Sequence, residues 1–196
     1  MNPEINTYEA PVNAKKIAFI NGLIWAFISL VIFLVSYYAA PGIFGNYSYS
    51  IVVLLISLGI AIFFTLDMRK KVGGYWSFKE ALSNIFIMFF VQHLIYALFV
   101  LMFGKFIEPA YVNQMREISL NTSVEMAETF GGGNQEVMDQ MIEEAEKSIE
   151  KSLNPTFGEF MQSLGISVIM YFVGALIFAA IFKRQRPVFE PIVDED

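Results

Sequence analysis

The sequence predicts an all-α membrane protein with four transmembrane helices and an acidic extracytoplasmic helical hairpin between the third and the fourth. Three observations lead to this fold class. Of the 196 residues, 56% are apolar and only 16% are charged, whereas about a quarter of the residues in a typical soluble domain are charged. The apolar residues gather in four long blocks, and most of the acidic residues gather in a single segment before the last block.

The four apolar blocks contain no Asp, Glu, Lys or Arg, and they cover residues 17–40, 49–66, 82–103 and 160–182. As helices they would reach about 27 to 36 Å, which matches a hydrocarbon core of about 30 Å. No polar face recurs along them, as it would in helices of a soluble protein. Lipid-spanning strands would instead alternate with a period of two. The first block is too long for the core of a cleaved secretory signal, so we expect it to remain as an anchor.

The basic residues predict the orientation of the chain in the membrane. The tails 1–16 and 183–196 and the loop 67–81 would lie on one side, and they carry nine of the 13 Lys and Arg residues. Basic residues near the ends of spans favour the cytoplasmic side. The sequence therefore predicts a multi-pass protein of a bacterial inner membrane with both termini in the cytoplasm.

The acidic segment is 104–159, which holds eleven acidic and four basic residues and so has a net charge of −7. This charge disfavours nucleic acid as a partner. Gly131, Gly132 and Gly133 with Asn134 predict a turn at 131–134, and the flanking stretches 109–130 and 135–153 predict two helices. The expected antiparallel hairpin pairs two apolar stripes, which are Tyr111, Met115, Ile118 and Met126 on the first helix and Met138, Met141, Ile142, Ala145, Ile149 and Leu153 on the second. The Met-rich stripe is read either as internal packing or as a groove for a partner helix.

Small or polar residues recur at intervals of four within each block, for example Asn21, Trp25 and Ser29, and Ser163, Ser167 and Tyr171. Such stripes are typical of a bundle interior. Five polar residues form a candidate intramembrane cluster: Asn21, Asn84, Gln92, His93 and Gln162. They would either pack within the bundle or line a narrow polar path. His93 is read either as a proton or ligand site or as a neutral imidazole that is hydrogen-bonded inside the bundle.

Catalytic chemistry has little support in the sequence. The chain has one His and no Cys, which excludes thiol catalysis and Cys-based zinc sites. No glycine-rich phosphate loop is present. We therefore expect no enzymatic activity, no cofactor and no metal site.

Two helix starts have the spacing of capping boxes. Ser77 and Glu80 precede the third apolar block, and Thr156 and Glu159 precede the fourth. Tyr75 and Trp76 beside the first box suit the headgroup layer of a membrane. Ser77, Glu80, Thr156 and Glu159 are therefore the predicted structural caps.

The stretch GGYWSFKEAL at 73–82, followed by IEPAY at 107–111, resembles the family of four-helix bacterial membrane proteins known as domain of unknown function 4199. The similarity covers roughly residues 15–183. The resemblance implies the fold, the topology and a bacterial inner membrane. It implies no catalytic residue, ligand or transported substrate, because none is assigned to the family.

Two functions are consistent with these features. The first is a structural or accessory subunit of the membrane that contacts another protein through its acidic outer hairpin. The alternative is a channel or carrier for a small solute, with a polar path near Asn84, Gln92 and His93. The lipid bilayer is the expected partner in both cases, and the oligomeric state stays open.

Overall fold

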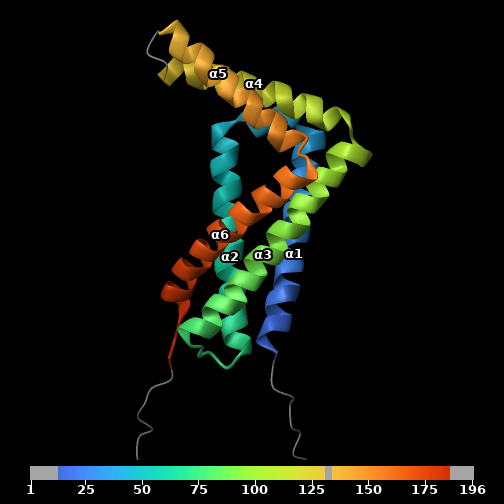
Figure 1. The fold of residues 1–196 in the computed structure, drawn as a ribbon. Coiled ribbons are helices and arrows are strands. Elements are labelled where there is room, and N and C mark those ends of the chain that lie inside the picture. Colours follow the sequence, from blue (N-terminus) through green and yellow to red (C-terminus); the bar gives the residue numbers. More distant parts are fainter. Residues whose placement is uncertain (1–12, 131–133, 186–196) are drawn as a thin grey trace, which may run out of the picture.

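The computed structural model describes residues 13–130 and 134–185, and these residues are almost entirely helical (Figure 1). The elements in chain order are α1 (Ala14–Ala39), the 3-10 helix η1 (Pro41–Gly45), α2 (Tyr47–Lys71), α3 (Phe78–Met102), the π-helical turn η2 (Phe103–Ile107), α4 (Ala110–Phe130), α5 (Gln135–Leu153) and α6 (Phe157–Phe182). Within the described part of the chain the one β-type pairing is an isolated bridge between Trp76 and Arg184. The glycine turn expected at Gly131, Gly132 and Gly133 lies outside the described residues.

Four helices are long and apolar enough to span a membrane: α1, α2, α3 together with η2, and α6. Each helix begins before its charge-free block because its N-capping residue stands outside that block. The Asn46 side chain, for instance, accepts a hydrogen bond of 2.8 Å from the Ser48 amide at the start of α2. Large apolar side chains face outward, including Phe27, Leu54 and Ile181, each about two-thirds exposed. Such a surface suits lipid and would be unfavourable in water.

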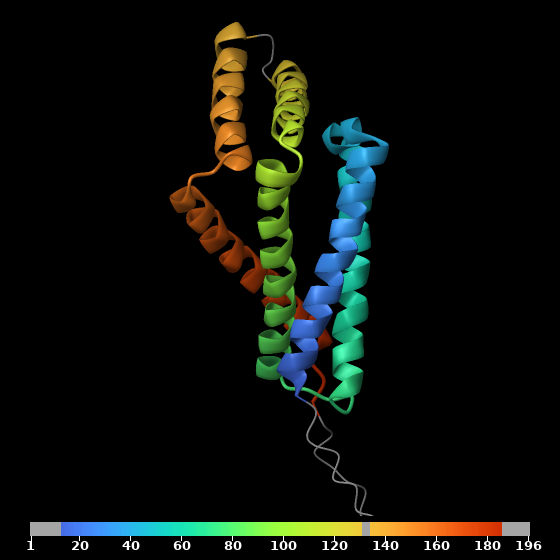
Figure 2. The same cartoon turned by 90° about the vertical axis from the view of Figure 1, so that its right-hand side faces the viewer.

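The four spans do not pack equally. α1 and α3 form the closest pair, α6 packs on α3, and α2 packs mainly on α1. The starts of α1 and α3 and the ends of α2 and α6 lie at one end of the bundle, here called the basal end (Figures 1 and 2). Its hydrophobic core contains Met68, Ile85 and Met88, all of which are almost fully buried.

An aromatic cluster closes the opposite end of the bundle. Phe33 of α1 lies within 5.4 to 5.6 Å, between ring centroids, of Phe103 and Tyr111, and most contacts in the cluster are edge-to-face, the arrangement that ring quadrupoles favour. Because Tyr111 lies in the first turn of α4, the cluster fixes the start of α4 at the end of the bundle, and α4 then runs across that end (Figures 1 and 2). Gly45 of η1 allows a second contact, since a Cβ there would lie 2.8 Å from the Ile118 Cγ2 atom.

This packing qualifies the expected stripe of the first hairpin helix. Tyr111 and Met115 are buried against the Phe33 cluster, and Met126 is half exposed. Ile118 of α4 and Leu153 of α5 pack against the same cluster, so the start of the α4 stripe faces the end of the bundle as well as the end of α5. The physical reason is that α4 follows η2 directly, so its first turns meet the apolar end of the bundle before they meet α5.

α5 runs beside α4 and has no fully buried residue. Its stripe residues Met138, Met141, Ile142, Ala145 and Ile149 are half buried. An ion pair joins Arg116 of α4 to Glu150 of α5. α5 is thus held mainly through α4, while the rest of its surface stays exposed.

Candidate functional site

A cavity of about 760 Å³ lies between α1, α2, α3 and α6; it is called the central cavity below. It forms because α2 and α6 are packed on different partners and leave space between them. Leu54 and Leu58 of α2 line the cavity and are also 66% and 45% exposed on the outer surface of the bundle. The central cavity therefore opens among the apolar residues that would face lipid.

Polar side chains line the central cavity close to the middle of their helices. The Gln92 amide of α3 donates a hydrogen bond of 3.4 Å to the Ser29 hydroxyl of α1. His93 Nδ1 and the Tyr171 hydroxyl of α6 share a hydrogen bond of 3.2 Å, and their rings lie 4.7 Å apart. Ser57 adds a hydroxyl from α2. Each of the four spans thus contributes a hydrogen-bonding group, which is costly in hydrocarbon unless it is paired.

Aromatic rings form much of the remaining wall. Phe89 of α3 meets Trp25 of α1 edge to face at 5.6 Å and Phe178 of α6 at 5.2 Å. The Trp25 indole N–H is buried, and the described residues offer it no hydrogen-bond acceptor. None of the described residues that line the cavity is Asp, Glu, Lys or Arg. The central cavity is therefore an aromatic, formally uncharged chamber with a few hydrogen-bonding groups.

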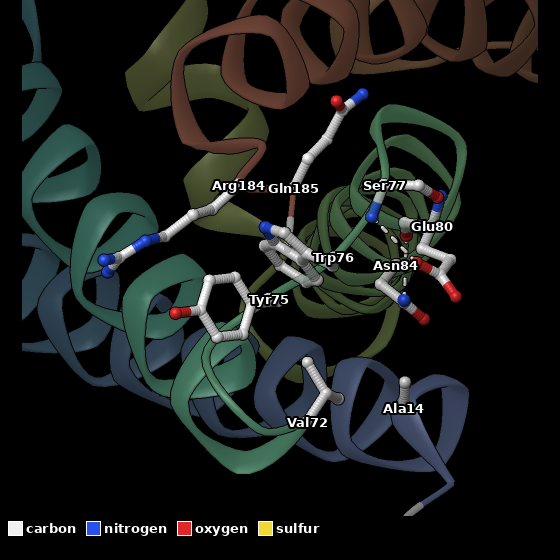
Figure 3. Close-up of a pocket in the computed structure, with 9 residues that line it drawn as sticks. All are labelled: Ala14, Val72, Tyr75, Trp76, Ser77, Glu80, Asn84, Arg184 and Gln185. Carbon is white, nitrogen blue, oxygen red and sulfur yellow. Dashed lines mark hydrogen bonds between the residues drawn. The ribbon is translucent and has the colours of Figure 1, made fainter. Parts of the chain in front are cut away.

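A second pocket, the basal pocket, has a volume of about 560 Å³ and lies at the basal end between α1, α3 and the residue pair that follows α6 (Figure 3). The main chains of Trp76 and Arg184 exchange two hydrogen bonds of 2.9 and 3.1 Å. The Trp76 indole N–H also donates to the Phe182 carbonyl at 2.9 Å. The Arg184 guanidinium lies 5.2 Å from the centre of the Tyr75 ring. These contacts join the end of α6 to the start of α3.

The sequence-predicted caps stand at the two ends of the bundle, with Ser77 and Glu80 at the basal end and Thr156 and Glu159 at the opposite end. The Ser77 hydroxyl accepts from the Glu80 amide at 3.3 Å, and the Glu80 carboxylate accepts from the Ser77 amide at 2.8 Å. Thr156 and Glu159 repeat both contacts, at 3.3 and 2.9 Å, at the start of α6. Both helices therefore begin in complete capping boxes.

The structure separates the five polar residues of the candidate cluster. Gln92 and His93 line the central cavity, whereas Asn84 lines the basal pocket. Asn21 is buried and lines neither pocket, and Gln162 is exposed on α6. The Asn84 side chain donates to the Glu80 carbonyl at 2.8 Å, while its oxygen and the Asn21 amide nitrogen are buried without a partner among the described residues.

Sequence reasoning did not place Trp25, Ser29, Ser57 or Tyr171 in the candidate cluster. All four belong to stripes of small or polar residues spaced by four, so the signal was present. The stripes identify residues that face the interior, but they do not distinguish a packed interface from a cavity. That distinction depends on how far α2 stands from α6.

The electrostatics of α4 and α5 differ between their two faces. Burial in the aromatic cluster raises the pKa of Tyr111 to about 12. On the exposed side, a hydrogen bond of 2.6 Å from Lys147 lowers the pKa of Glu143, and the same bond raises the pKa of Lys147. Both partners of this pair are two-thirds exposed, so it contributes little to stability. Among the described residues, no group of three or more His, Asp or Glu side chains is placed to hold a metal ion.

Comparisons with known proteins bear on the whole chain. No curated protein and no solved structure was found to match it. The family model described as "Protein of unknown function (DUF4199)" matches residues 16–184. With most of its length covered, including all four membrane-capable helices, the chain belongs to the DUF4199 family.

Proposed function

We propose that the protein is an accessory subunit of a bacterial inner membrane that contacts another protein through α4 and α5. In this proposal α4 and α5 form an acidic hairpin outside the cytoplasm, and both termini lie in the cytoplasm. The protein acts by binding and catalyses no reaction.

The observation that carries the proposal is a set of exposed apolar side chains on the part of the helix pair farthest from the bundle. Val124, Met126 and Phe130 at the end of α4 are 36%, 52% and 72% exposed, and Val137 at the start of α5 is 41% exposed. We refer to these four residues as the apolar tip. An apolar group that projects into water is a common feature of protein interaction sites.

The anchoring of α4 supports this role. The Phe33 cluster holds the first turns of α4 against the bundle, so the apolar tip projects from a fixed base. A rigid support lowers the entropy that is lost when a partner binds. The segment 104–159 carries a net charge of −7, and electrostatic complementarity therefore favours a partner with a basic surface.

Affinity purification with two matched variants tests this proposal. A V124S/M126S/F130S variant should lose its partner protein, while an E125Q/E128Q variant should keep the partner but bind it more weakly at low salt. The apolar change removes buried contact area, whereas the charge change removes only electrostatic steering. If the serine variant retains every protein that copurifies with the wild type, the apolar tip is not the contact site.

Site-directed labelling tests the topology separately. The chain contains no Cys, so single cysteines can be introduced at Asn134 and at Lys70. An impermeant maleimide added to spheroplasts should label N134C and spare K70C until the membrane is broken. Labelling in the reverse order would place α4 and α5 in the cytoplasm and overturn the proposed orientation.

The alternative function, a channel or carrier for a small solute, stays a prediction. Its polar path was expected near Asn84, Gln92 and His93; Gln92 and His93 line the central cavity, and Asn84 lines the basal pocket. Solute flux into liposomes, compared between the wild type and a His93→Ala variant, would test it.

A further inference from the structure

We propose that the central cavity is a binding site for a neutral, lipid-soluble ring compound that carries hydrogen-bond acceptors, of the chemical class of the isoprenoid quinones. The inference concerns binding alone and is independent of the role proposed for α4 and α5. It depends on the size, the charge, the position and the lining of the cavity.

The size and position of the central cavity fit a ligand that arrives through lipid. Its volume of about 760 Å³ lies in the range of roughly 300–1,000 Å³ that is typical of small-molecule sites. Leu54 and Leu58 stand both in its wall and on the outer surface of the bundle. A molecule dissolved in the bilayer can therefore reach the cavity without crossing water.

The absence of formal charge in the lining decides which head groups are acceptable. A phosphate, a carboxylate or an ammonium placed at mid-membrane depth needs an opposite charge close to it. Of the described residues that line the cavity, His93 is the one side chain able to become charged near neutrality, and it is already hydrogen-bonded to Tyr171. A neutral ligand is the class that this lining accommodates.

The hydrogen-bonding groups indicate that the ligand is more than an acyl chain. Gln92 of α3 and Ser57 of α2 line the cavity and can each donate a hydrogen bond into it, while the Tyr171 hydroxyl of α6 is shared with His93. Carbonyl oxygens on a ring would satisfy such donors, whereas a hydrocarbon chain would leave them unpaired.

The aromatic walls favour a flat ligand. Trp25, Phe89 and Phe178 form a continuous edge-to-face series with centroid distances of 5.2 to 5.6 Å, and Tyr96 also lines the cavity. A planar ring makes stacked or edge contacts with such walls. An isoprenoid tail would then leave the cavity past Leu54 and Leu58 into lipid.

Tryptophan fluorescence in lipid nanodiscs tests the proposal directly. The protein has two Trp residues, Trp25 in the cavity wall and Trp76 at the basal end, so a Trp76→Phe variant reports on the cavity alone. Titration with ubiquinone that carries one isoprene unit should quench Trp25 emission to saturation. Gln92→Leu and His93→Phe should each weaken this binding by roughly three- to tenfold, the expected loss for one hydrogen bond.

Two controls make the experiment decisive. Gln162→Leu makes the same chemical change as Gln92→Leu at an exposed site on α6, so it should leave binding unchanged. Retention of the quinone on immobilised wild-type protein, followed by its absorbance, gives an affinity that does not depend on the Trp76→Phe variant folding. Unsaturable quenching that is equal in all variants, or equal displacement by a simple alkane, would overturn the proposal.

Discussion

Gly22 of α1 lies directly against the main-chain carbonyl of Met88 of α3. A Cβ atom at position 22 would lie 2.8 Å from the Met88 carbonyl oxygen and 3.0 Å from the Val91 Cβ. The close approach explains why α1 and α3 form the tightest pair of the bundle, since small residues let helix backbones approach in lipid. This pair in turn fixes two walls of the central cavity.

Gly22→Ala should therefore destabilise the bundle. The neighbour at 2.8 Å is main chain, which cannot move aside cheaply, and overpacking of a core costs about 1–3 kcal/mol. Thermal unfolding in detergent, followed by circular dichroism, measures the effect. Gly59→Ala is the matched control, because a Cβ at Gly59 of α2 meets nothing within 4 Å. Equal stability of the two variants would contradict the close packing of α1 and α3.

The capping boxes predict a second pair of effects. Ser77→Ala removes the acceptor for the Glu80 amide and should cost about 0.5–2 kcal/mol. Ser77→Thr keeps a hydroxyl at the same place and should restore most of the loss. Denaturant titration of the purified protein distinguishes the two variants. If threonine fails to rescue alanine, the effect of Ser77 does not arise from capping.

The hydrogen bond of the Trp76 indole is expected to stabilise the junction between α6 and α3. Trp76→Phe keeps an aromatic ring but removes the N–H that donates to the Phe182 carbonyl. One lost hydrogen bond of this kind costs about 0.5–1.5 kcal/mol, so the variant should fold and unfold at a slightly lower temperature. Tyr75→Phe, which leaves a ring beside Arg184, should show a smaller shift. A larger loss in the tyrosine variant would argue against the indole contact as the main clamp.

Because Tyr111 has a raised pKa, the protein is expected to lose stability in alkaline solution. The pKa of Tyr111 is raised from 10.0 to about 12, so folding favours the neutral hydroxyl. The resulting stabilisation is complete below about pH 10 and disappears as the pH rises through 12. In Tyr111→Phe the unfolding temperature should fall less between pH 9 and pH 12 than in the wild type. Tyr47→Phe, which changes a ring that is 80% exposed, should follow the wild-type curve.

Much of the fold follows from local features of the chain. The four apolar blocks and the two capping boxes depend on residues close to one another in the chain, and periodicity and cap spacing report such short-range forces directly. The stripe on α4 could not be assigned in the same way. Whether Tyr111 and Met115 face α5 or the bundle depends on two apolar surfaces that compete for one helix.

The residues of the candidate cluster lie apart for a related reason. Its members are all polar and lie in apolar helices: Asn21, Asn84, Gln92, His93 and Gln162. Polarity alone does not determine which side of each helix packs against its neighbours. Gln162 stands near the start of α6, where that helix leaves the bundle (Figure 2), so it is exposed. Gln92 and His93 sit where α3 meets α1 and α6, so they line the cavity.

The sequence by itself determined the number of long apolar helices, their approximate limits, the two capped helix starts and the concentration of acidic residues before α6. These properties depend on hydrophobic length, charge and hydrogen bonds between neighbours in the chain. The tertiary structure alone decided that α1 and α3 meet at Gly22, that α4 is fixed by the Phe33 cluster, and that a cavity opens between α2 and α6. Those outcomes depend on shape complementarity between surfaces far apart in sequence, which no local pattern encodes.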